Sequence, residues 1–153
     1  MEITKIPNKI LSKKVKQIKL DDLKSGKYTR LIEQMRQDMI ANNGIGLAAN
    51  QVGQDLAIFV IDKNLATENG VPDVYINPDI TDYSKDKDDM EEGCLSIPDF
   101  FIPIKRSKKI KLKALDENGN KLKIKARGLL ARVLQHETDH LNGLTIKNRQ
   151  AKI

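Results

Sequence analysis

The sequence predicts an α+β fold, with antiparallel strands packed around a central helix. Three observations support this class: a helical pattern over residues 28–43, an alternating pattern on both sides of residues 118–119, and a second helical pattern from Leu129 onward. Strands and helices that segregate in this way are typical of α+β domains. With 153 residues, 39% of them hydrophobic, the chain can bury the core of a single domain spanning residues 1–153.

The first helix is predicted from four apolar side chains at helical spacing, and Gly44 ends the pattern. These side chains are Leu31, Ile32, Met35 and Met39. Methionines at such spacing are typical of a hydrophobic core rather than of a ligand site. We therefore expect this helix to pack against the sheet.

Two short apolar runs with β-branched members predict strands at residues 56–61 and 74–77, and the second run ends before Pro78. Acidic residues then cluster between Asp82 and Glu92 around two lysines. Such a charged stretch indicates an exposed loop or sheet edge.

The clearest hairpin spans residues 110–126. Apolar residues alternate with lysines on both sides of Asn118-Gly119, a pair that favours a tight turn. From Leu129 to Leu141 the apolar period becomes helical. This last helix is therefore expected to be mostly buried.

Both histidines of the chain lie on that helix, in an HExxH sequence formed by His136, Glu137 and His140. At positions i and i+4 the two imidazoles share one face and can hold a divalent metal. Glu137 is then placed to take a proton from water beside the metal and to pass it to a leaving group. The pattern also arises by chance on polar helix faces, so further ligands have to be found.

Cys94, the only cysteine, is the candidate third ligand. A lone cysteine is usually a small buried apolar residue, but this one follows Gly93 and two acids rather than lying in an apolar run. A zincin-type peptidase would usually take its third ligand downstream of the helix. The 13 residues after His140 contain no His, Asp or Glu, which favours Cys94.

A run of small residues at positions 44–53, with the sequence GIGLAANQVG, contains the amide side chain of Gln51. The glycines could simply end the preceding helix, and the match to a phosphate loop is poor because no GK[ST] follows. Among small neighbours, the Gln51 amide can point an N–H at a substrate carbonyl, as an oxyanion site requires.

Taken together, GIGLAANQ, EGCLS and QHETDHL closely resemble the three signature motifs of the peptide deformylases. The resemblance covers nearly the whole chain. Residues 3–11 resemble the family's N-terminal strand and turn, and residues 106–119 resemble its strand leading into a hairpin.

The resemblance implies a role for each motif residue. Cys94, His136 and His140 would bind the metal, and Glu137 would act as general base and then as acid. Gln51 through its side chain and Leu95 through its backbone N–H would stabilise the oxyanion. The reaction implied is removal of formate from the N-formylmethionine of a newly synthesised polypeptide. The implied metal is Fe(II) in the cell, with zinc, nickel or cobalt able to replace it.

The resemblance also implies how the peptide binds. Ile45, Gly46 and Gly93 would pair with its backbone, while Leu129 and Val133 would line an apolar pocket for the methionine. Each of these five residues could equally serve the core or a turn.

Two features depart from the family pattern. Phe101 stands where many members carry an arginine, so contacts beyond the methionine are expected to differ. The short tail after His140 resembles phage-encoded members rather than those with a long C-terminal helix. Arg106 does match the family, and Asp139 is expected to pair with it in support of the metal ligands.

A net charge of +6 and a pI near 9.3 suggest contact with nucleic acid. The lysines are spread along the sequence and aromatic residues make up only 4%, so no specific DNA binding is expected and any ribosome contact should be weak. No apolar leader or membrane-length stretch is present, and no disulfide can form within the chain, which favours the cytoplasm of a bacterium or of a phage host.

A second functional class is a catalytically idle protein that keeps this fold to bind peptide or RNA. All three candidate ligands, Glu137 and Gln51 are present, so no missing residue supports that alternative.

Overall fold

The structure, a computed structural model, describes residues 1–150. Its helices are α1 (Leu20–Lys24), α2 (Thr29–Ala41), α3 (Lys63–Glu68), α4 (Gly128–Leu141) and α5 (Ile146–Arg149), with short 3-10 turns η1 (Lys9–Ser12) and η2 (Ala49–Val52). Its strands are β1 (Gly46–Ala48), β2 (Ile58–Ile61), β3 (Val74–Tyr83), β4 (Lys87–Cys94), β5 (Ile97–Ser107), β6 (Lys109–Leu115) and β7 (Lys121–Arg127).

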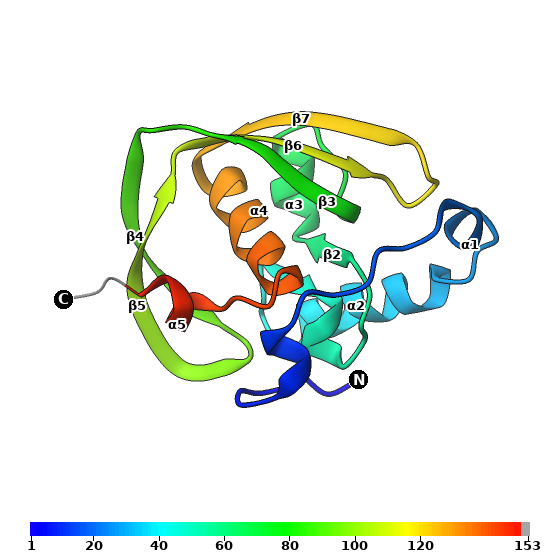
Figure 1. Cartoon of the computed structure of the whole chain (residues 1–153), viewed down its shortest axis with the longest axis horizontal. Helices are drawn as coiled ribbons and strands as arrows, with labels where there is room; N and C mark the ends of the chain where they lie inside the picture. Colours follow the sequence, from blue (N-terminus) through cyan, green and yellow to red (C-terminus); the bar gives the residue numbers. More distant parts are fainter. Residues whose placement is uncertain (151–153) are drawn as a thin grey trace.

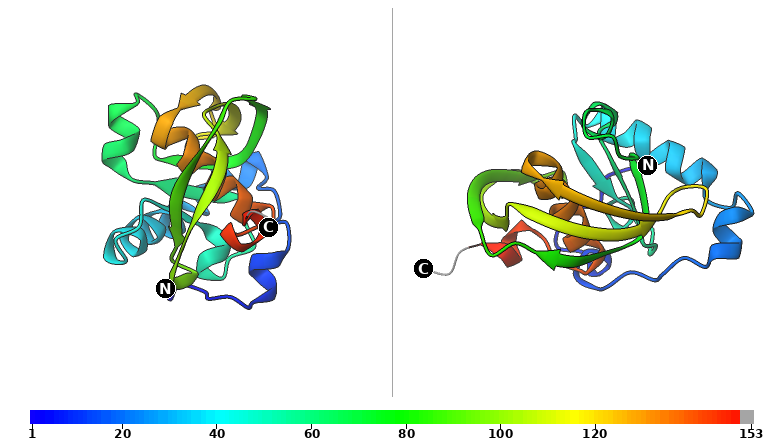
Figure 2. Two further views of the ribbon diagram at one scale, coloured as in Figure 1. Left: turned by 90° about the vertical axis from the view of Figure 1, so that its left-hand side faces the viewer. Right: turned by 90° about the horizontal axis from the view of Figure 1, so that it is seen from above.

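The strands form two antiparallel sheets. Five of them pair in the order β1-β2-β3-β6-β7, and β4 pairs with β5 in a separate hairpin. Figure 1 shows this hairpin at one side of α4, and Figure 2 shows the long strands β6 and β7 passing over the same helix. The predicted α+β class, with antiparallel strands around a central helix that carries His136 and His140, is therefore confirmed.

The central helix α4 begins directly after Arg127, and Gly128 adopts a φ of +62° at the bend. A glycine enters this left-handed region without the penalty that a side chain carries. Leu130 and Leu134 then pack against Ile110 and Leu112 of β6 in one buried cluster. Because the cluster spans helix and sheet, the residues around the histidines are held by the core.

Helix α2 confirms the first predicted helix to within two residues at each end. Its buried side chains Ile32, Met35 and Met39 contact a second core cluster that includes Leu47 of β1 and Ile58 of β2. The methionines are core residues, as the spacing predicts.

Residues 3–11 were expected to form a strand and a turn, and the strand is wrong whereas the turn is present as η1. Thr4 and Ile6 each donate one backbone hydrogen bond, to Gln51 and Ser96, and no strand ladder forms before η1. The side chain of Asn8 instead accepts from the Ile10 N–H and starts a 3-10 turn.

The strand predicted to end before Pro78 continues to Tyr83. A register shift between Ile76 and Asp79 surrounds the proline, and such a bulge accommodates a residue that has no N–H to donate. The acidic stretch after Asp82 is mostly strand, because β4 starts at Lys87, and it forms an exposed edge as the charge pattern allows.

No helix within residues 1–150 is long and apolar enough to cross a membrane.

Candidate metal centre

Cys94, His136 and His140 come together although Cys94 lies 42 positions before His136 in the sequence. Cys94 ends β4, and both histidines project from α4. One ligand atom from each residue lies within 4.8 Å of the other two, and Cys94 Sγ is 3.2 Å from His140 Nε2. The three residues form the metal-binding site that the motifs predict.

The tautomer of His136 is set by Glu92, whose Oε1 lies 2.9 Å from His136 Nδ1. An Nδ1–H held by a carboxylate leaves Nε2 as the free donor for a metal. The two imidazole rings stand edge to face, with centroids 5.0 Å apart. Their spacing is that of one helical turn.

The pKa values of the two imidazoles are shifted in opposite directions. Although burial opposes the imidazolium form, the Glu137 carboxylate and contacts with Cys94 and Glu92 raise the pKa of His136 to about 10. Burial and the charge of His136 lower the pKa of His140 well below its usual range. One sulfur and two imidazole nitrogens are a donor set that suits Fe(II), Zn, Ni and Co, and three protein ligands leave a position for water or substrate. The residues present therefore fit a catalytic divalent metal.

Glu137 points into the same space and is almost completely buried. Its Oε2 lies 4.0 Å from His136 Nε2, and its Oε1 has no hydrogen-bond partner among the described residues. Burial raises the pKa of Glu137 to about 7. A carboxyl group with such a pKa can both accept and return a proton near neutral pH.

Gln51 is held on η2 with its amide N–H group turned toward the cysteine. Its Oε1 accepts from the Ala48 N–H at 3.0 Å, which fixes the orientation of the amide. Its Nε2 then faces Ser96 Oγ at 3.2 Å and Cys94 Sγ at 3.6 Å. Leu95 follows the cysteine in the turn between β4 and β5, so its backbone N–H belongs to the same corner of the site.

A buried network of charged side chains surrounds Glu92, the residue that binds His136 Nδ1. Glu92 Oε2 and Oε1 accept from Arg106 at 2.7 and 2.9 Å, and Arg132 donates to the same Oε2. Although burial favours the neutral acid, His136 and Arg106 lower the pKa of Glu92 to about 2, so it remains a carboxylate.

The expected pair of Arg106 with Asp139 is present, with Arg106 Nη1 2.9 Å from Asp139 Oδ2. Arg149 also binds Asp139 through two hydrogen bonds. Sequence reasoning missed Glu92 and Arg132. Their positions gave a signal: Arg132 lies four residues before His136 on the same helix face, and Glu92 lies two before Cys94 on one strand.

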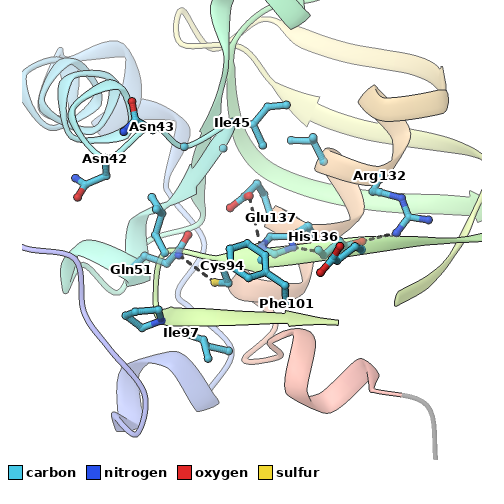
Figure 3. A pocket seen from close by; sticks show the side chains of 18 of the residues that line it. Asn42, Asn43, Ile45, Gln51, Cys94, Ile97, Phe101, Arg132, His136 and Glu137 are labelled. Atoms are coloured by element: carbon cyan, nitrogen blue, oxygen red, sulfur yellow. Dashed lines mark hydrogen bonds and ion pairs between the residues drawn. The ribbon is translucent and has the colours of Figure 1, made fainter. Parts of the chain in front are cut away.

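A cavity of about 610 Å³ opens onto two of the metal-binding residues, Cys94 and His136. Its lining includes all five residues expected to contact substrate, namely Ile45, Gly46, Gly93, Leu129 and Val133. Figure 3 shows Gln51, Cys94, His136 and Glu137 converging on this cavity, with Phe101 beside them. The Phe101 side chain is 63% exposed, so an apolar ring stands at the mouth.

At two of the glycines in the lining, an added Cβ would meet a neighbouring side chain. A Cβ at Gly46 would lie 2.6 Å from Glu137 Oε2. A Cβ at Gly93 would lie 2.6 Å from Cδ1 of Phe101. Neither glycine has a positive φ, so the constraint comes from neighbours rather than from backbone strain.

Comparison with known proteins agrees with this arrangement. A family model described as polypeptide deformylase matches residues 1–153. A peptide deformylase of Prochlorococcus marinus strain MIT 9312 is 45% identical over 149 residues, which cover 97% of this chain and 73% of that protein.

Solved structures agree as well. The peptide deformylase of Thermotoga maritima superposes with a TM-score of 0.87 at 37% identity, covering 99% of this chain and 97% of that one. The enzyme of Vibrio parahaemolyticus bacteriophage VP16T, solved in complex with actinonin, gives 0.84 at 34% identity, covering 95% and 99%.

Proposed function

The chain belongs to the polypeptide deformylase family and has the family's hydrolytic activity, and from this premise we propose how its own residues perform the reaction. The substrate is a polypeptide that begins with N-formylmethionine, and the products are formate and a free amino terminus. The observation that carries the proposal is the convergence of Cys94, His136 and His140, next to a cavity that Cys94, His136 and Glu137 line.

Cys94, His136 and His140 would hold the metal. A bound divalent ion supplies Lewis acidity, which polarises the formyl carbonyl and lowers the pKa of a water molecule. We propose Fe(II) as the metal in the cell, with zinc, nickel or cobalt as replacements, because the mixed sulfur and nitrogen donor set accepts each of them. The thiolate of Cys94 would make an iron form sensitive to oxygen.

Glu137 is proposed as the proton carrier. Its carboxylate would accept a proton from the attacking water and then deliver it to the departing amine nitrogen. Its burial and its free Oε1 support this role, because no hydrogen bond within residues 1–150 has to break before the proton is accepted.

Gln51 and Leu95 are proposed to stabilise the oxygen of the tetrahedral intermediate. The Gln51 amide is oriented by Ala48 before substrate arrives, and an N–H that now faces Cys94 or Ser96 would turn to the substrate oxygen. The Leu95 backbone N–H would provide the second donor. Preorganised donors of this kind stabilise charge only as it develops.

The cavity lining supports the proposed binding mode. Leu129 and Val133 line the cavity and would offer apolar surface to the methionine side chain, and the backbone near Ile45, Gly46 and Gly93 would pair with the peptide. Phe101 at the mouth would contact residues that follow the methionine.

We also propose that the chain works in the cytoplasm of a bacterium or a phage host on nascent polypeptides, with weak attraction to the ribosome.

The test is formate release from a short formyl-methionyl peptide by protein loaded anaerobically with Fe(II) or with Ni(II). The unformylated peptide and Glu137→Ala serve as controls. We expect release by the wild type alone. A folded, fully metallated protein that releases no formate would instead support the idle binding protein.

A further inference from the structure

The β6–β7 hairpin carries a strip of basic side chains on one face, although in the sequence the lysines alternate with apolar residues and are separated by a turn. The strip consists of Lys109, Lys111 and Lys113 of β6 and Lys121, Lys123, Lys125 and Arg127 of β7, all exposed. The alternate residues, among them Ile110, Leu112 and Ala126, pack against α4. The strip therefore faces away from the metal-bearing helix, and the basic residues are not simply spread out.

Strand register places these cations directly opposite one another. Lys109 faces Arg127, Lys111 faces Lys125, and Lys113 faces Lys123. Like charges at directly opposed positions destabilise a sheet. The strip holds seven of the 27 lysine and arginine residues of the chain.

Carboxylates do little to neutralise the strip. Asp79 and Asp82 of β3 lie beside it, as the register partners of Lys113 and Lys111. Within residues 1–150, Lys111 is the only strip residue with a carboxylate within 4.0 Å, and both members of that pair are more than half exposed. Solvent screens such a pair and leaves it with little binding energy.

Protection of a sheet edge explains only part of the strip. Lysines on an edge strand prevent unwanted strand pairing, and β7 is an edge of the five-stranded sheet. However, β6 lies between β3 and β7, so its three lysines guard no edge. Edge protection therefore does not explain the lysines of β6.

We propose that the strip is a docking surface for the phosphate backbone of structured RNA, a proposal that rests on the function of processing newly synthesised polypeptides. Cations recur about every 7 Å along each strand, and the strip is about 20 Å long. An exposed face of lysine and arginine with no aromatic residue suits phosphates, which are read without base stacking. It does not suit membrane insertion, which requires apolar side chains beside the cations.

One end of the strip lies close in sequence to the lining of the active-site cavity. It ends at Arg127, and Leu129, two residues later, lines the cavity. RNA bound along the hairpin would therefore adjoin the rim of the substrate pocket. Docking would raise the local concentration of polypeptides that emerge near that RNA.

The test measures binding of a fluorescent RNA hairpin by anisotropy, from about 50 to about 200 mM KCl. The strip variant combines Lys113→Gln, Lys123→Gln and Lys125→Gln. A matched variant combines Lys9→Gln, Lys19→Gln and Lys63→Gln, which removes equal charge from exposed positions elsewhere. A third variant carries arginine at the three strip positions.

We expect the strip variant to bind RNA about tenfold more weakly, with a slope of log affinity against log salt that is smaller by about 2. The matched and arginine variants should stay near wild type. Equal weakening in the strip and matched variants, or no binding by the wild type at the lowest salt, would overturn the proposal. So would tight strip-dependent binding to phosphatidylserine vesicles with RNA affinity unchanged.

Hydrolysis of a free formyl-methionyl peptide separates this inference from the proposed function. The strip variant should hydrolyse the peptide at the wild-type rate, since its lysines face away from the metal site. If neither the wild type nor any variant hydrolyses the peptide but RNA binding is unchanged, the proposed catalysis is contradicted and the proposed RNA-binding role of the strip is not.

Discussion

Arg132 binds Glu92, and through that carboxylate it connects the metal-bearing helix to the hairpin that carries Cys94. Its Nη1 also donates to the carbonyl of Ile104 at 2.9 Å, and its Nη2 donates to Asp88. Glu92 in turn holds His136 Nδ1. One guanidinium therefore fixes the relative position of two metal ligands that belong to different elements.

Replacing Arg132 with methionine should speed metal release by about 10- to 100-fold, because loss of a residue that hydrogen-bonds the partner of a metal ligand typically weakens metal binding by this factor. The measurement is the rate at which Co(II) passes from the protein to a chromophoric chelator. Arg30→Met, at an exposed arginine of α2, is the matched control and should release metal at the wild-type rate. Equal rates for both variants would show that Arg132 does not support the site.

Glu137→Gln should lower kcat/KM on a formyl-methionyl peptide by about 10²- to 10⁴-fold, the usual contribution of a positioned acid or base. Metal content should stay near one ion per chain, because the three donors do not include Glu137. Metal analysis and formate release on the same preparation check both statements. Loss of metal together with activity would mean that Glu137 acts as a ligand.

Gln51→Glu and Gln51→Ala together test the oxyanion role. The glutamate variant keeps an oxygen that can accept from Ala48 but replaces the Nε2 donor that faces Cys94. Both variants should lose about 10²- to 10³-fold in kcat, as expected for one missing oxyanion donor. Wild-type kcat in the glutamate variant would leave Gln51 a purely structural residue of η2.

Metal removal should lower thermal stability, because the ion would join the end of β4 to α4. An ion present at about 1,000 times its Kd stabilises the folded state by about 4 kcal/mol. Calorimetry with and without a chelator measures the effect. Cys94→Ala should remove most of the difference, and a difference that persists in this variant would indicate a second metal site.

The sequence and the structure agree best where a pattern is local. Helix α2, the β6–β7 hairpin and the HExxH helix each follow from the spacing of neighbouring apolar residues, and the motif carries its own ligand geometry. What the sequence could not show depends on contacts between distant segments. The buried network around Glu92 requires β4, β5 and α4 to meet, and the paired lysines require the register of two strands. The strand predicted for the N-terminal segment is absent, because single hydrogen bonds to Gln51 and Ser96 replace a strand ladder there.

Gly46→Ala tests whether the position of Glu137 limits catalysis. The added Cβ would lie 2.6 Å from Glu137 Oε2 and 2.9 Å from its Cδ, so the carboxylate would have to shift within the cavity that it lines. A displacement of about 1 Å in a catalytic group can cost about 10²-fold in rate, so we expect a loss of that order with metal content unchanged.

A double-mutant cycle makes this test specific. Glu137→Ala removes the atoms that the new methyl group would meet, so adding Gly46→Ala to that background should change the residual rate by less than about twofold. The comparison uses formate release by all four proteins under the same metal loading. If the two losses simply multiply, the glycine affects catalysis through some route other than Glu137, such as pairing with the peptide backbone.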